Sequence, residues 1–89
     1  MEKDIKTLRS KGKALEPILH IGKNGITQGT IDLIARELEQ RNLIKIKLNK
    51  AAVGDGGKAD RKAMAEEICQ KTHAKLVELV GNTLVLYRG

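Results

Sequence analysis

The segment 43–48 constrains the fold more than any other part of the chain, because aliphatic residues and lysines alternate through most of it. Alternation with a period of two is typical of a β-strand with one buried face and one wet face. The residues expected to pack against helices are Ile44, Ile46 and Leu48. Lys45 and Lys47 are expected to point the other way, so the chain has to build a sheet with an exposed basic face.

Three stretches have the apolar spacing of helices. The first covers residues 3–13 and stops before Glu16-Pro17, since the residue before a proline is biased away from helical geometry. The second opens with Thr27 as its N-cap and ends near Asn42. The third follows a glycine-rich loop at 49–57, with Asp60 as a possible cap. The apolar faces expected for the second and third helices are Ile31, Ile34, Ala35 and Leu38, and then Met64, Ala65, Ile68, Cys69 and Thr72.

Three further runs complete the sheet. Residues 18–21 form a short apolar strand, and residues 75–80 and 83–88 flank Gly81-Asn82, which suits a two-residue hairpin turn with glycine first. The predicted order is helix, strand, helix, strand, helix, strand, strand. We expect an α/β (α+β) two-layer sandwich with a four-stranded mixed sheet, as a single domain over 1–89. Right-handed crossovers place the second and third helices on one face, while the position of the first helix stays open.

The tetrapeptide Gly22-Lys23-Asn24-Gly25 lies between the first strand and the second helix. Two glycines around a lysine allow the backbone to approach a bulky anion, because no Cβ blocks the approach and positive φ is accessible. This chemistry suits a phosphate backbone. The same residues could equally form an ordinary turn, so the tetrapeptide needs support from the rest of the chain.

Charge supplies part of that support. The chain carries 17 Lys and Arg against 11 acidic residues, a formal charge of +6, which attracts polyanions. We expect this surface to bind a polyanion such as a phosphate backbone, with an acidic protein partner and a small anionic ligand as alternatives. The basic residues expected to extend an anion grip are Lys6, Arg9, Lys11 and Lys13 on the first helix, Lys45 and Lys47 on the second strand, and, more weakly, Arg41 and Arg88.

Catalysis, metal binding and membrane insertion find no support in the sequence. The single cysteine, Cys69, permits no intramolecular disulfide, and His20 and His73 have no acidic, cysteine or serine partner at an informative spacing. With Tyr87 as the only aromatic residue, a sheet that stacks bases on paired rings is not expected. We therefore expect no enzyme, no cofactor and no metal, in a monomeric cytoplasmic protein without a signal peptide or a membrane span.

Three segments together carry a family resemblance: 22–27, 43–47 and 81–88. In this order and spacing they resemble the CRM domain, named for chloroplast RNA splicing and ribosome maturation, and in particular its stand-alone YhbY-like form. The resemblance covers essentially the whole chain. The stretch at 54–57 departs from it, since it is longer than the connection expected in bacterial members.

The resemblance implies RNA binding, with ribosomal RNA in precursors of the large subunit (pre-50S) as the partner of stand-alone members. The family's glycine loop (GxxG) corresponds to residues 22–25. The implied fold is similar to the C-terminal domain of translation initiation factor three, with the last strand inside the sheet and the third at an edge. The sequence agrees with that order, because residues 84–87 are almost wholly apolar whereas Lys75 and Glu78 would guard an edge.

Overall fold

The chain forms three helices and four strands in the computed structural model, which describes residues 4–22, 25–49 and 58–88. The predicted order of elements is confirmed. In chain order the elements are α1 (Ile5–Ala14), β1 (Leu19–Ile21), α2 (Gln28–Arg41), β2 (Leu43–Leu48), α4 (Lys58–Thr72), β3 (Lys75–Val80) and β4 (Thr83–Tyr87).

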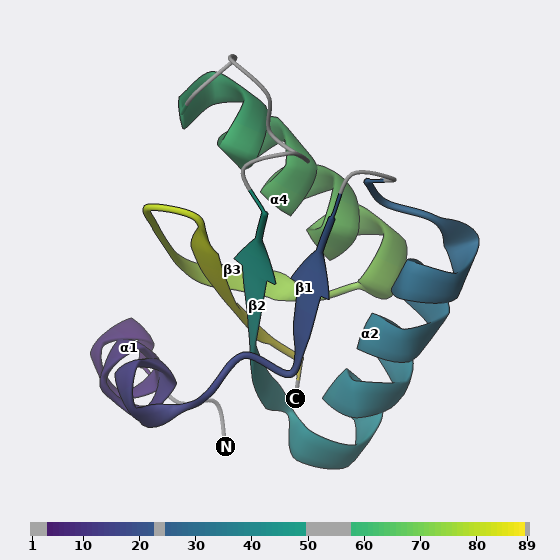
Figure 1. Ribbon diagram of the computed structural model, residues 1–89. Helices are drawn as coiled ribbons and strands as arrows, with labels where there is room; N and C mark the ends of the chain where they lie inside the picture. The colour runs from purple at the N-terminus through teal and green to yellow at the C-terminus, as the bar shows by residue number, and fades with distance from the viewer. Residues whose placement is uncertain (1–3, 23–24, 50–57, 89) are drawn as a thin grey trace.

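The four strands form one mixed sheet in the order β1-β2-β4-β3. β1 runs parallel to β2, and β4 is antiparallel to both β2 and β3. The prediction that the last strand lies inside the sheet and the third at its edge is therefore confirmed. Because β1 and β2 are parallel, they end at the same edge, which we call the carboxyl edge (Figure 1). The β3–β4 turn also reaches this edge, where the Leu48 N–H donates to the Asn82 carbonyl at 2.6 Å.

The helix ends follow local capping chemistry. α1 begins after Asp4, whose carboxylate accepts the Thr7 N–H at 2.8 Å, and this hydrogen bond lowers the pKa of Asp4. Thr27 caps α2 as predicted, accepting the Thr30 N–H at 3.2 Å. The predicted cap at Asp60 is wrong, since α4 begins at Lys58 and places Asp60 inside the first turn, where a carboxylate still complements the helix dipole.

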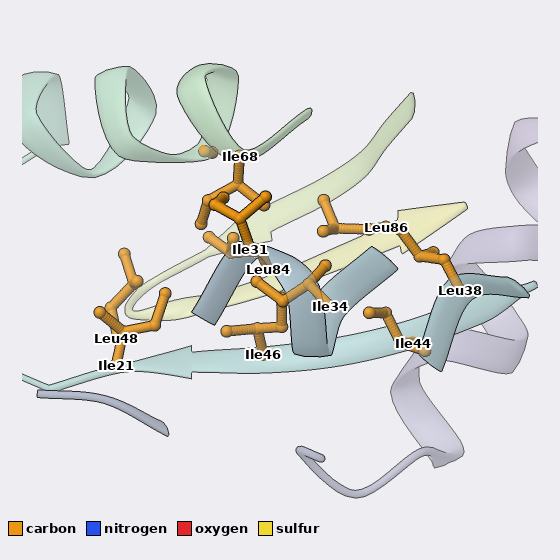
Figure 2. Packing of buried hydrophobic residues seen from close by; sticks show 11 residues of the cluster. Ile21, Ile31, Ile34, Leu38, Ile44, Ile46, Leu48, Ile68, Leu84 and Leu86 are labelled. Atoms are coloured by element: carbon orange, nitrogen blue, oxygen red, sulfur yellow. The ribbon is translucent and has the colours of Figure 1, made fainter. Parts of the chain in front are cut away.

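The main core lies between the sheet and the pair α2 and α4 (Figure 2). The three expected positions of β2 are buried there, and the predicted apolar faces of α2 and α4 pack against them, except that Ala35 is half-buried and does not belong to this core. Thr72, the buried polar side chain of the described residues, donates its hydroxyl to the Ile68 carbonyl at 2.7 Å. The buried members of this core are Ile21, Ile31, Ile34, Leu38, Ile44, Ile46, Leu48, Ala65, Ile68, Leu84 and Leu86.

α1 covers part of the opposite face, which settles the one position that the sequence left open (Figure 1). Leu8 packs there with Val77 of β3 and Val85 of β4 in a second, smaller cluster. A Cβ added at Gly12 would come within 2.8 Å of a Val85 methyl, so the helix lies as close to the sheet as a residue without a side chain permits. We call the sheet face on this side the open face, because α1 leaves its part near the carboxyl edge uncovered.

Because of this close approach, replacing Gly12 by alanine should change stability in the opposite direction from replacing Gly29, another helical glycine. Gly12→Ala gains about 1 kcal/mol of helix propensity but forces apart α1 and a stiff, buried valine, which typically costs about 1–3 kcal/mol. We expect a net destabilisation of about 1 kcal/mol, measured by urea unfolding. Gly29→Ala, where the nearest atom is 3.8 Å away and the residue is exposed, should instead stabilise by up to about 1 kcal/mol. Stabilisation by both changes would contradict the packing described for α1.

Candidate functional site

Gly22 and Gly25, the two described residues of the glycine loop (22–25), lie at the carboxyl edge of the sheet. Gly22 follows the last residue of β1, and the Gly25 N–H donates to the Gly22 carbonyl at 2.9 Å. Gly25 has a φ of +68°, a conformation that side chains with a Cβ rarely adopt. Apart from their chain neighbours, none of the described residues has an atom within 4 Å of a Cβ built at either glycine, so these leave the backbone open to a bulky ligand. Lys23 and Asn24 lie outside the described residues.

The helix α2 begins directly after this loop. Thr27 satisfies one of its first-turn N–H groups, and the positive end of the helix dipole faces the loop side. A helix N-terminus next to an open glycine backbone is a common setting for phosphate binding. Gly22 and Gly25 thus combine open backbone with a neighbouring helix N-terminus, which is the arrangement that the sequence predicted.

The strand register brings a row of four residues across the open face, one step from the carboxyl edge. His20 pairs with Lys47, Lys47 pairs with Thr83, and Thr83 pairs with Val80. His20 and Lys47 are exposed, and Val80 is 61% exposed at the sheet edge. Gly22 lies two residues beyond His20 along β1, about 7 Å at the usual rise of a strand. The row is therefore continuous with the glycine loop.

A shallow groove of about 230 Å³ runs from this row toward α1. Its lining includes Lys13 of α1, Lys45 of β2 and Glu78 of β3, together with Thr83. The prediction that the lysines of β2 point away from the main core is confirmed, with Lys47 exposed and Lys45 half-buried beside α1. The open face is thus basic on its β2 side and carries an acid on its β3 side.

The basic residues of α1 divide between two flanks. At 100° per residue, Lys6, Arg9 and Lys13 share one flank of the helix, whereas Lys11 falls on the other side of the buried stripe. Lys13 borders the groove, and the Arg9 Nε donates to the Val77 carbonyl at 3.3 Å, which ties α1 to β3. The three residues on the first flank are thus placed to extend the basic surface of the sheet, and Lys11 is not.

Arg41 and Arg88 lie at the other end of the sheet from the glycine loop. Arg41 is the last residue of α2 and pairs with Glu37 at 2.7 Å. Arg88 follows β4, and its Nη1 donates to the carbonyl of Thr72, the last residue of α4, at 2.9 Å. Both arginines therefore have partners within the fold, and both lie apart from the groups at the carboxyl edge.

The other side chains that could take part in catalysis, base stacking or metal binding do not gather into a site within the described residues. Burial, with the charge of Glu66 second, raises the pKa of Cys69 to about 11, so its thiol is protonated at neutral pH and is a weak nucleophile. Tyr87 packs partly buried against the α1 cluster. Within 4–22, 25–49 and 58–88, no group of three or more His, Cys, Asp or Glu side chains could hold a metal ion. None of the helices described is long and apolar enough to cross a bilayer.

The sequence did not single out two members of the row, His20 and Thr83, as site residues. Neither belongs to a motif, and each gains its position from the register of a neighbouring strand rather than from its own segment. The pattern that could have found them is the alternation of β1 and β4, which puts both side chains on the face opposite the main core.

Comparison with known proteins gives a consistent result. The model of the CRS1 / YhbY (CRM) domain family matches residues 1–88. The probable RNA-binding protein YqeI of Bacillus subtilis is 37% identical over 86 residues, covering 97% of this chain and 84% of the relative. A probable RNA-binding protein of Pseudomonas aeruginosa is 34% identical over 83 residues, covering 93% of this chain and 75% of the relative.

A solved structure agrees with these relatives. The solution structure of a Staphylococcus aureus protein, described as a candidate RNA-binding protein, superposes with a TM-score of 0.79 at 34% identity. The match covers 96% of this chain and 83% of the other.

The two distal arginines should differ in their effect on stability. Arg88→Ala removes a charge-assisted hydrogen bond to the carboxyl end of α4, and we expect a loss of about 1–2 kcal/mol in the free energy of unfolding. Arg41→Ala, which breaks an exposed ion pair within one helix, should change it by less than about 0.5 kcal/mol. Urea unfolding of both variants measures the difference, and equal effects would contradict the structural role assigned to Arg88.

Proposed function

This chain belongs to the CRS1 / YhbY (CRM) domain family, and we propose that it binds RNA through the glycine loop and the basic side of the open face. The observation that carries the proposal is the continuity between the two: the register places Lys47 beside His20, two residues from the open backbone of Gly22. Relatives that match nearly the full chain are named as probable RNA-binding proteins, which supports the same class of ligand.

In the proposed complex the backbone amides of the glycine loop, aided by the N-terminus of α2, hold one or two phosphates. Lys23 supplies an adjacent charge. Lys47, Lys45 and Lys13 then follow the sugar-phosphate backbone over the open face, and Lys6 and Arg9 extend the same surface along α1. This mode relies on the shape and backbone of the RNA, and it needs neither a cofactor nor a catalytic step.

We propose ribosomal RNA in precursors of the large subunit as the partner, as the family resemblance implies for stand-alone members. The protein would then act as a monomer in the cytoplasm, where these precursors mature in bacteria and archaea. The competing proposal is an adaptor that docks its basic face on an acidic protein, which the exposed Lys47 would also permit. A third proposal is that the loop binds a small anion. Titration with mononucleotides tests it, because the affinity for a small anion would not depend on RNA length whereas RNA binding would.

Gly22 offers the sharpest test of the glycine loop. Chain neighbours aside, no atom of the described residues lies within 4 Å of a Cβ built there, so Gly22→Val should leave stability nearly unchanged while its methyl groups block the approach of a phosphate. We expect RNA affinity to fall about tenfold or more, as for the loss of a hydrogen bond to a charged group. Fluorescence anisotropy with labelled ribosomal RNA fragments measures the change, with thermal unfolding as the check on folding.

Ala63→Val is the matched control, because it adds the same kind of bulk at an exposed position of α4, on the other side of the sheet. Unchanged RNA affinity in Gly22→Val would reject the loop as the phosphate site and favour docking through lysines.

The affinity for RNA should also fall steeply with salt. The slope of log affinity against log salt concentration should be about −0.7 for each single-strand phosphate contact. A flat salt dependence would remove the electrostatic basis of the proposal.

The ribosomal target is tested in cells by crosslinking and sequencing the bound RNA. We expect the native protein to enrich large-subunit precursor RNA, and the double variant Lys23→Glu, Gly25→Asp, checked for folding, to lose that enrichment. Aspartate tolerates the left-handed backbone at position 25 better than most residues, which favours a folded variant. Enrichment of other RNA would retain RNA binding but reject the ribosomal assignment.

A further inference from the structure

The row across the open face contains two polar, hydrogen-bonding side chains on either side of a lysine. His20 of β1 and Thr83 of β4 both pair with Lys47 of β2, so all three side chains leave the sheet on the same side. Neighbouring strands lie about 4.8 Å apart, which puts each polar group one strand away from the Lys47 stem. We call these three residues the ribose strip.

We propose that the ribose strip contacts ribose 2′-hydroxyls on both sides of a phosphate held by Lys47, and so gives this protein a preference for RNA over DNA. The inference rests on the RNA binding proposed above and assigns His20 and Thr83 as further binding residues. A lysine recognises a phosphate in either nucleic acid, whereas the 2′-hydroxyl exists only in RNA.

The chemistry of the two flanking groups fits this role. The 2′-hydroxyl is both a donor and an acceptor, so an imidazole and a hydroxyl can each form a hydrogen bond with it. Each ribose adjoins its phosphate directly, so a phosphate on Lys47 brings its two neighbouring sugars toward the adjacent strands. No ring platform competes for this position, because Tyr87 packs beside the α1 cluster.

The acidic side of the groove defines where the strip ends. Glu78 of β3 pairs with Val85 and lines the groove on the same face as Thr83. Its carboxylate repels a phosphate backbone, so the RNA should pass over β1, β2 and β4 and leave the β3 edge free. This path leads from the glycine loop to Lys45 and Lys13, which line the groove.

The test compares an RNA stem-loop of about 16 base pairs, enough for shape-specific recognition, with a DNA stem-loop of the same sequence. Thr83→Val removes the hydroxyl but keeps the β-branched shape, and His20→Ala acts at an exposed position of an edge strand. We expect each to weaken RNA binding about fivefold, as for one ordinary hydrogen bond, and DNA binding less than twofold. Lys47→Ala should weaken the binding of both nucleic acids equally.

Thr7→Val is the matched control, since the same substitution falls on an exposed position of α1 on the flank away from Lys13. It should change neither affinity. If Thr83→Val and His20→Ala leave the ratio of RNA to DNA affinity unchanged, the ribose strip is rejected. Equal binding of RNA and DNA by the native protein would also reject it while leaving RNA binding through the glycine loop intact, whereas binding of neither would reject both proposals.

Discussion

The insertion of β4 between β2 and β3 is the interaction on which the rest of the structure depends. Its alternate residues serve two cores: Leu84 and Leu86 face α2 and α4, and Val85 faces α1. The last strand of the chain therefore joins both layers of helices to the sheet. Its end is fastened by two bonds between Asn42 and Arg88, in which the Arg88 N–H donates to the Asn42 carbonyl and the Asn42 side-chain amide donates to the Arg88 carbonyl, both at 2.9 Å.

The same arrangement explains why one part of the sheet stays exposed. α1 is ten residues long and sits over Val77 and Val85, where the missing side chain of Gly12 lets it reach the sheet. None of the described helices covers the part of the face near the carboxyl edge, and there the strands place His20, Lys47, Thr83 and the exposed Val80. A covered core and an uncovered basic surface thus share the same strands, so the rigidity of the core positions the groups of the proposed binding surface.

Much of the fold was predictable because its signals are local. The alternation in β2, the cap at Thr27 and the glycine at the hairpin turn each act within a few residues, and each prediction was confirmed. The prediction that Asp60 caps α4 was wrong, because Lys58 and Ala59 are good helix formers and the helix already begins at Lys58. The candidate site was predictable only where a motif marks it, as at Gly22 and Gly25, and the roles assigned to those residues stay predictions.

The sequence by itself determined which segments become helices or strands and which side of each segment is apolar, because periodicity and capping depend on neighbours along the chain. Only the tertiary structure decided where α1 packs, which basic residues gather near the glycine loop, and that His20 and Thr83 flank Lys47. It also placed Arg88 on the end of α4, far from that surface. The strand register and the position of α1 depend on contacts between residues distant in the chain. They are fixed when the two cores pack against the two faces of one sheet.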